Sequence, residues 1–252
     1  QSGTSHFFGD GFAKQFGITF TDKDNMQKYP MQTSWGLSTR IIGGIIMTHG
    51  DNSGLVLPPR IAPVQVIVVP VAQHKEGVVE KATELYDAIK AAGFRAKIDT
   101  SDNSLGWKCA QYEMKGVPLR VELGPRDIAE GKCVLVSRVD RSKTVVSLDG
   151  VEDAVAEKLA AIRDELYEKA LANRQAHTYD CTSLDELKQK LGENGDGFVR
   201  AMWCGDPECE DKVKELTEVG SRCIPFDQEQ LSDKCVCCGR PAKKLVYWGK
   251  AY

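Results

Sequence analysis

The chain has 252 residues, a formal net charge of −3, 42% hydrophobic residues and 27% charged residues. This length is enough for two or three compact globular units. The acidic balance excludes nucleic-acid binding through the overall field, so any such contact needs a local basic patch. No apolar run approaches the roughly 20 residues that span a bilayer, and no signal peptide is visible.

The chain begins with Gln1 rather than Met, and we expect further sequence upstream. Residues 1–57 are dense in Gly, Ser, Thr and aromatic residues. We expect a loop at 1–9, a short helix at 12–16, a strand at 18–20, a polar turn at 22–29 and a strand at 33–39. Residues 40–49 are apolar on all sides, which predicts a buried helix.

Three Pro residues between positions 58 and 63 predict a domain boundary. Strands then alternate with helices as far as about residue 175, which predicts an α/β unit with a largely parallel sheet. The expected strands are 64–70, 94–98, 117–123, 132–139 and 144–148. The expected helices are 76–92, 104–115 and a long one from 151, with a turn at 124–127.

The remaining residues are predicted to form a small domain of short strands and helices. Residues 177–192 are expected to be helical, because Ser183 is followed three residues later by Glu186, as in a capping box. A second helix is expected near 210–219. Six of the nine Cys residues lie in the last fifty positions. Without a secretory signal, such clustering favours metal binding over disulfides.

The Cys residues form two closely spaced pairs, Cys204 with Cys209 and Cys235 with Cys238. Two such pairs separated by a loop of some two dozen residues fit a closed, structural four-cysteine zinc site. The spacing of the second pair and the following Gly favour Cys238 over Cys237 as the fourth ligand. The alternative is a set of reduced, buried cysteines.

Two further groups of residues are candidates for small-molecule contacts. Ser38 and Arg40 lie at the expected start of a helix, where free N–H groups favour an anion; an ion pair between Arg40 and a carboxylate is an equal alternative. His6 lies beside Thr4 in a loop with Gln1, and by itself this pattern favours a core histidine over a ligand contact or a general base.

A third group combines aromatic, basic and acidic side chains. Such side chains can stack on single-stranded bases and hydrogen bond to their edges. Without further information a solvated charged face is the simpler interpretation. The group consists of Trp107, Lys108, Glu113, Arg120 and Arg126.

Together these stretches resemble the C-terminal half of the prolyl-tRNA synthetase family, of the archaeal and eukaryotic kind that ends in a zinc domain. The resemblance runs through the chain in order. It is carried by GTSH at 3–6, SWGLSTR at 34–40, MTHGD at 47–51, GLVLPP at 54–59, GWK at 106–108, GVPLR at 116–120, GPRD at 124–127 and GKAY at 249–252.

The resemblance implies a chain of three α/β and α+β parts. Residues 1–60 are similar to the end of a class II catalytic domain with an antiparallel sheet. Residues 61–170 are similar to an α/β anticodon-binding domain with a mixed five-stranded sheet. Residues 171–252 are similar to a small zinc-binding α+β domain.

The same resemblance assigns roles to individual residues. Arg40 matches the catalytic arginine of class II motif 3, which stacks on adenine and contacts phosphate. The ATP and magnesium contacts are assigned to Gln1, Thr4, Ser38 and Arg40, and the proline contacts to His6 and Trp35. The anticodon contacts are assigned to Glu113, Arg120 and Arg126, and the zinc ligands to Cys204, Cys209, Cys235 and Cys238. Tyr252 matches a C-terminal residue that reaches towards the active site.

The implied activity is ATP-dependent attachment of L-proline to tRNA(Pro) through prolyl-adenylate, with Mg2+ and a structural Zn2+. The resemblance also implies a cytoplasmic homodimer, paired through the N-terminal catalytic domain, without a membrane contact. Motifs 1 and 2 of class II synthetases are absent from the sequence, so a complete site needs more chain. The alternatives are a tRNA-binding module, a synthetase paralogue without aminoacylation activity and, more remotely, a Cys-based redox enzyme.

Overall fold

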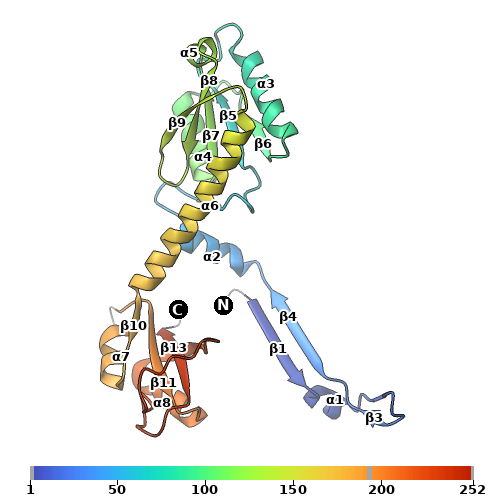
Figure 1. The fold of residues 1–252 in the computed structure, drawn as a ribbon, viewed down its shortest axis with the longest axis vertical. Helices are drawn as coiled ribbons and strands as arrows, with labels where there is room; N and C mark the ends of the chain where they lie inside the picture. The colour runs from blue at the N-terminus through green and yellow to red at the C-terminus, as the bar shows by residue number, and fades with distance from the viewer. Residues whose placement is uncertain (1–2, 192–194, 251–252) are drawn as a thin grey trace. The chain divides into compact units, whose positions relative to one another are not determined.

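A computed structural model describes residues 3–191 and 195–250 (Figure 1). Gln1 and Tyr252, both assigned roles above, lie outside these residues. The chain divides into an N-terminal unit, Gln1–Tyr167, and a C-terminal unit, Glu168–Tyr252. The division falls within the long helix α6, Val151–Ala176. Among the described residues, no helix combines the length and hydrophobicity needed to cross a membrane.

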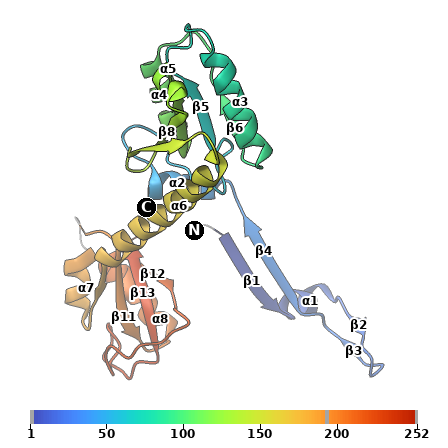
Figure 2. The same ribbon diagram turned by 45° about the horizontal axis from the view of Figure 1, so that its top comes forward.

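The N-terminal unit begins with a two-stranded antiparallel ribbon (Figure 2), made of β1, Gly3–Gly9, and β4, Gln32–Leu37. The connection between them holds helix α1, Gly11–Phe16, and a short hairpin of β2, Phe20–Thr21, with β3, Gln27–Lys28. The prediction of a loop at 1–9 is therefore wrong. Pairing with β4 decides the conformation of this Gly-rich segment, and no local hydrophobic pattern reports such pairing.

Helix α2, Arg40–His49, confirms the predicted helix but not its predicted burial. None of its residues is buried, and Met47 is 81% exposed. A helix that is apolar on all sides needs neighbours on all sides. The described part of the chain supplies too few of them, so the apolar surface of α2 remains open.

The second part of the N-terminal unit is built on a five-stranded sheet with strand order β6-β5-β7-β8-β9. The three strands β5, β6 and β7 are parallel, whereas β8 and β9 are antiparallel additions. The strands are β5 Val66–Pro70, β6 Ala96–Ile98, β7 Leu119–Leu123, β8 Lys132–Ser137 and β9 Lys143–Ser147. The mixed sheet implied by the family resemblance is confirmed, and the expectation of a largely parallel one holds for three strands.

Helices cover both faces of this sheet. Val66 and Val68 of β5 pack in one cluster with α3, Val78–Ala91, and with the first turns of α6. Ile67 and Val69 point the other way, towards Tyr112 of α4, Leu105–Met114. Strand β5 is thus buried on both faces, as its continuous apolar sequence indicates.

Residues 124–127 were expected to form a turn, but the structure has a short helix, α5, Pro125–Ala129. Pro125 lies at its start, where a missing N–H costs nothing. The Asp127 side chain accepts a hydrogen bond from the Gly124 N–H at 2.8 Å. These two local features convert the expected turn into a helical one.

The segment that follows α2 is fastened to the end of α4. Leu55 N–H donates to the Met114 carbonyl at 3.0 Å, and the approach is so close that a Cβ on Gly54 would lie 2.6 Å from the Met114 backbone. Arg138 completes the attachment through a two-pronged ion pair with Asp51.

The C-terminal unit contains a four-stranded sheet with strand order β10-β11-β13-β12. Its core surrounds Trp248, which is fully buried. Helices α7, Leu184–Leu191, and α8, Pro207–Thr217, pack on this core. The strands are β10 Thr178–Asp180, β11 Phe198–Trp203, β12 Val219–Cys223 and β13 Lys244–Lys250.

The expected helix at 177–192 is instead strand β10 followed by α7. The capping interactions at the start of α7 are present. Ser183 Oγ accepts from Glu186 N–H at 3.3 Å, and the Glu186 carboxylate accepts from Thr182 N–H at 2.7 Å. The capping box therefore marked the true helix start, and β10 forms because β11 lies parallel to it.

Removal of apolar volume from the sheet core tests this layered arrangement. Val121→Ala in β7, at a fully buried position, should lower the free energy of unfolding by about 2 kcal/mol. Val145→Ala in β9 is the matched control, because that side chain is 60% exposed. Chemical denaturation followed by circular dichroism measures both variants. Equal losses of stability would contradict the assigned core.

Candidate functional site

Arg40 lies at the first position of α2, and Ser38 and Thr39 separate it from the end of β4. Its backbone N–H donates to Ser38 Oγ at 3.4 Å, which places the hydroxyl at the start of the helix. The Arg40 side chain is exposed. Within the described ranges it forms no ion pair with a carboxylate, so the alternative of a structural ion pair finds no support there. The guanidinium and the helix N-terminus together favour an anion.

The register of the ribbon decides which side chains share a face. Thr4 lies opposite Gly36 and His6 opposite Ser34, so Thr4, His6 and Ser34 are on one face. Trp35 lies opposite Ser5, on the other face, and is 82% exposed. The expectation that His6 and Trp35 line one pocket is therefore not met by the ribbon, because adjacent strand positions alternate between faces.

His6 is exposed, so the interpretation as a core histidine is wrong. Its ring stacks on Phe8, with centroids 5.3 Å apart and planes 11° from parallel. Stacking fixes the imidazole plane while leaving its nitrogen atoms accessible. The face with Thr4, His6 and Ser34 therefore presents two hydroxyls and an imidazole to a ligand.

A second constellation joins α4 to β7. Arg120 Nη1 donates to Glu113 Oε1 at 3.2 Å, and Arg120 Nε donates to Glu122 Oε1 at 2.9 Å. Lys143 of β9 donates to the second oxygen of Glu122 at 3.2 Å. The Arg120 guanidinium is thus held between two carboxylates, and the Glu113 side chain stays partly exposed.

Sequence reasoning found Glu113 and Arg120 but missed Glu122 and Lys143. Glu122 follows Arg120 by two positions in a strand, so the two side chains share a face. That alternation was the available signal for Glu122. Lys143 had no local signal, since it reaches the site through the pairing of β8 with β9.

The other members of the predicted basic and aromatic group lie apart from this pair. Arg126 is exposed on α5, beyond the end of β7, and Trp107 is exposed on the first turn of α4. Lys108 is buried: its Nζ donates to Gln73 Oε1 at 2.9 Å and to the Asp99 carbonyl at 3.0 Å. Its assignment to a solvated face was wrong, and Lys108 serves the packing of α4.

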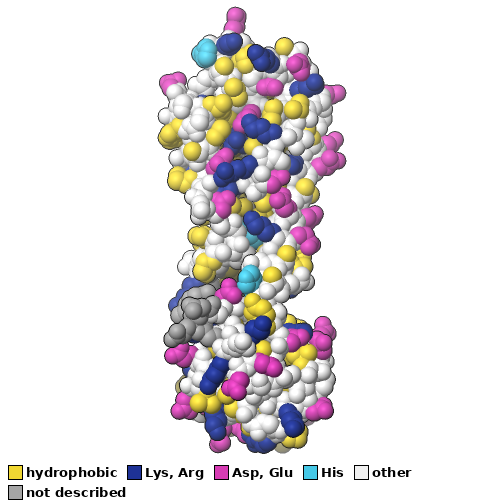
Figure 3. Space-filling model, turned by 90° about the vertical axis from the view of Figure 1, so that its left-hand side faces the viewer, with side chains coloured by type: hydrophobic (Ala, Val, Ile, Leu, Met, Phe, Trp, Pro, Cys, Tyr) yellow, Lys and Arg dark blue, Asp and Glu magenta, His cyan; other side chains and the backbone are white. Residues whose placement is uncertain are grey.

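Basic side chains are not gathered into one field on the surface seen in Figure 3. Lys and Arg side chains are interspersed there with Asp and Glu. This distribution agrees with the net charge of −3. On this face, recognition of an anionic partner has to rely on individual contacts rather than on a large potential.

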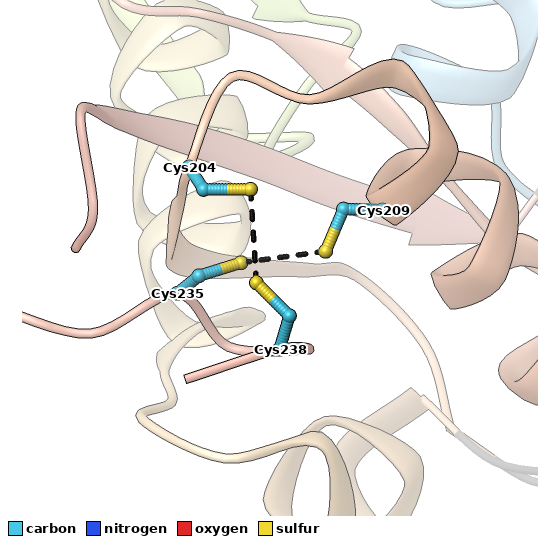
Figure 4. Close-up of side chains that lie close together, drawn as sticks. All are labelled: Cys204, Cys209, Cys235 and Cys238. Carbon is cyan, nitrogen blue, oxygen red and sulfur yellow. Dashed lines mark hydrogen bonds between the residues drawn. The ribbon is translucent and has the colours of Figure 1, made fainter. Parts of the chain in front are cut away.

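The four cysteines of the predicted metal site converge in the C-terminal unit (Figure 4). The Sγ atoms of Cys204, Cys209, Cys235 and Cys238 all lie within 4.8 Å of one another. The separation is 3.6 Å between Cys209 and Cys235 and 3.8 Å between Cys204 and Cys238. A tetrahedral zinc with Zn–S bonds of about 2.3 Å places its sulfurs about 3.8 Å apart, so the donor set fits this ion.

Local structure explains how four sulfurs meet. Cys204 follows β11, Cys209 lies in the first turns of α8, and the other two flank a tight loop. Gly239, with φ of 70°, allows that loop to turn, and its N–H donates to the Cys235 carbonyl at 3.1 Å. Cys237 does not belong to the group of four, which agrees with the preference for Cys238.

Arg240 lies beside the sulfurs and was missed by sequence reasoning. Its Nε is 3.2 Å from Cys238 Sγ, and its Nη2 donates to Asp206 Oδ2 at 2.6 Å. This guanidinium lowers the pKa of the Cys238 thiol to about 6, whereas burial raises the pKa of Cys209. An adjacent cation favours thiolate, which is the form that binds metal.

Comparison with known proteins finds two matching families. A family described as "Anticodon binding domain" matches residues 65–158, and one described as "Prolyl-tRNA synthetase, C-terminal" matches residues 184–252. These ranges contain the Glu113–Arg120 pair and the four cysteines, respectively.

Proteins named proline–tRNA ligase are similar to the whole chain. The relative from Lachnospira eligens is 59% identical, that from Lachnoclostridium phytofermentans 58%, and that from Clostridium novyi 54%. Each alignment covers all of this chain and 52% of the relative, so the chain spans about half the length of these proteins. The chain is therefore similar over its whole length to proteins named proline–tRNA ligase, and it contains segments that match an anticodon-binding domain and a prolyl-tRNA synthetase C-terminal domain.

Proposed function

We propose that this chain is part of an enzyme that attaches L-proline to tRNA(Pro) with ATP. The observation that carries the proposal is its similarity, over its whole length, to proteins named proline–tRNA ligase. We further propose three functional parts: residues 1–60 of the catalytic domain, residues 61–170 for the anticodon and residues 171–252 around a metal. Pairing of two copies through the catalytic domain and a cytoplasmic location remain part of this proposal.

In the first step, the proline carboxylate attacks the α-phosphate of ATP and releases pyrophosphate. In the second step, a terminal ribose hydroxyl of tRNA takes the prolyl group from the adenylate. Neither step needs a covalent enzyme nucleophile, so positioning and charge stabilisation supply the catalysis. Mg2+, when bound, neutralises phosphate charge.

Arg40 is the candidate catalytic residue, because its exposed guanidinium can stack on adenine and pair with phosphate. Ser38 and Thr4 are candidate ATP contacts, and Gln1, outside the described residues, is retained as a candidate for the ATP–metal region. His6 is the candidate proline contact, and Ser34 joins it from the same face of the ribbon. Trp35 is no longer placed beside His6, since it lies on the other face.

Replacement of Arg40 tests the activation step. In the complete enzyme, Arg40→Ala should lower ATP–pyrophosphate exchange at least about a hundredfold, since one lost contact of this kind costs on the order of 3 kcal/mol in the transition state. The affinity for tRNA(Pro), measured by filter binding, should stay close to that of the unchanged enzyme. Retained exchange in the variant would reject the role of Arg40.

The Glu113–Arg120 pair is the candidate reader of the anticodon, with Arg126 as a further contact. A carboxylate accepts hydrogen bonds from base amino groups, and a guanidinium donates to guanine O6 and N7. The Arg120 Nε donates to Glu122, and this contact fixes the plane of the guanidinium before any base binds. Trp107, exposed on α4, is available for stacking on an unpaired base.

Glu113→Gln tests this reading. The variant should lower kcat/KM for aminoacylation of tRNA(Pro) by about 5- to 150-fold, the effect of about 1–3 kcal/mol from one well-placed base contact. Exchange of ATP with pyrophosphate in the absence of tRNA should not change. Glu165→Gln, at an exposed position on α6, is the matched control. An unchanged kcat/KM in Glu113→Gln would contradict the assignment. Exchange of ATP with pyrophosphate by the protein also distinguishes an enzyme from a tRNA-binding module or an inactive paralogue, since neither of these catalyses it.

The four cysteines are proposed to hold a structural Zn2+. All four positions of a tetrahedral site are filled by sulfur, so no position is left for a reacting water. Four thiolates leave a net negative charge on such a site, and Arg240 offsets part of it from the outer shell. The metal would tie the start of α8 to the loop at 235–238.

Metal analysis tests the site directly. The purified chain should contain one zinc per molecule, and Cys209→Ser should lose it. Cys223→Ser is the matched control, because that cysteine is exposed and outside the group of four. Arg240→Gln should keep the zinc but bind it about 10- to 100-fold more weakly, as measured by competition with a chelator. Zinc in the Cys209 variant would overturn the ligand set.

A further inference from the structure

The charged side chain of Arg138 is almost completely buried, at 2% exposure, where β8 ends. Its Nη1 and Nη2 donate to the two carboxylate oxygens of Asp51 at 2.8 and 2.7 Å. Its Nε donates to the Glu113 main-chain carbonyl at 2.9 Å. One guanidinium therefore connects two segments that are far apart in the sequence.

The first segment is the last turn of α4. Glu113 accepts from Arg138 with its main-chain oxygen and from Arg120 with its side chain. A small cavity is lined by Glu113, Arg120 and Arg138 together, so the two arginines approach the same residue from two sides. Glu113 therefore contacts one arginine through its backbone and the other through its side chain.

The second segment is the end of α2. Asp51 follows the helix by two residues, and Gly50 between them donates its N–H to the Ile46 carbonyl at 2.8 Å. Asp51 and Gly54 exchange backbone hydrogen bonds at 3.1 and 3.0 Å, which makes the turn after the helix rigid. Arg40 occupies the first position of the same helix, so α2 carries Arg40 at one end and the Asp51 contact just beyond the other.

The ion pair is a strong contact by its geometry. It is bidentate, its cation is buried, and the favourable pairing with Arg138 holds the pKa of Asp51 below its ordinary value. Loss of one partner from a buried pair leaves the other without compensation, so the contact between the two segments would be lost.

We propose that the Asp51–Arg138 ion pair is the positioning contact that couples the Glu113–Arg120 pair to helix α2. The inference rests on the proposed roles of Glu113 and Arg40 and adds a physical link between them. A base bound at Glu113 changes the position of the Arg138 guanidinium, and the ion pair with Asp51 moves the end of α2 with it. Asp51 and Arg138 touch neither substrate nor base in this scheme.

Steady-state aminoacylation by the complete enzyme tests the coupling. The probes are two transcripts: tRNA(Pro) with its own anticodon and the same tRNA with one anticodon base replaced. For the unchanged enzyme, the replaced base should lower kcat as well as raise KM. For Asp51→Asn, kcat should be equally low with both transcripts, and kcat with the normal transcript should fall by about 5- to 150-fold, the usual range of coupling between sites.

Two further readouts separate coupling from a general loss of structure. The ratio of KM values between the two transcripts, and exchange of ATP with pyrophosphate without tRNA, should stay as in the unchanged enzyme. Arg141→Gln is the matched control, because it removes a neighbouring contact to Ser53 of the same segment without touching Glu113. For Arg141→Gln, the ratio of kcat between the normal and the altered transcript should match that of the unchanged enzyme.

A double-mutant cycle completes the test. Arg138→Lys keeps the charge but loses the bidentate geometry, and its effect on kcat should not add to that of Asp51→Asn. If Arg138→Lys fails to fold, the kcat ratio of Asp51→Asn decides, since that side chain is 41% exposed and tolerates an amide. Three results would each overturn the proposal. The first is a ratio of kcat between the two transcripts that is the same in Asp51→Asn as in the unchanged enzyme. The others are additive effects of the two substitutions on kcat, or no effect of the replaced base on kcat of the unchanged enzyme. Absence of exchange in the unchanged enzyme would instead reject the proposed function.

Discussion

The contact on which the N-terminal unit depends is the burial of one guanidinium between a helix end and a turn. A guanidinium is a charged group with five N–H donors, and burial removes water from around that of Arg138. It therefore requires a carboxylate and a carbonyl in fixed positions, which Asp51 and Glu113 provide. The need to satisfy this charge fixes how the segment after α2 meets the last turn of α4, and the close backbone approach of Gly54 to Met114 follows from the same arrangement.

Other arginines in the chain follow the same rule at sites with different proposed roles. Arg120 is held by two carboxylates, and Arg240 bridges Asp206 and the sulfur cluster. Each is positioned before any ligand arrives, so little conformational entropy remains to be lost on binding. Arg40 differs, because its side chain is exposed and has no carboxylate partner in the described ranges. A free guanidinium at a helix start suits the contact with a nucleotide proposed for it.

The ribbon of β1 and β4 differs in kind from the sheet of the same unit. An isolated pair of strands has two open faces and is only marginally stable in water. Both faces carry large apolar side chains that remain exposed, Phe7 and Leu37 on one face and Phe8 on the other. The five-stranded sheet, in contrast, is covered by helices on both sides, and its strand β5 is buried throughout. The two parts therefore differ in how much of their stability this chain supplies.

Local sequence determined much of the α/β part and of the metal site. Apolar and alternating segments with turn residues between them predicted the five strands of the sheet and the helices around them. The signal was continuous for β5, which is buried on both faces. The spacing of Cys204, Cys209, Cys235 and Cys238 predicted their convergence, and the short pairs needed only a loop to meet. The family resemblance likewise needed only the order of short motifs along the chain.

Tertiary structure decided the remainder. Strand β1 exists because β4 lies beside it, and the register of that pair separates Trp35 from His6. Lys108 is buried, and Glu122, Lys143 and Arg240 complete sites that their neighbours in the sequence did not reveal. The Asp51–Arg138 pair joins residues 87 positions apart. Contacts of this kind depend on which segments fold together. The residues next to a charged side chain in the sequence do not indicate which residue will pair with it.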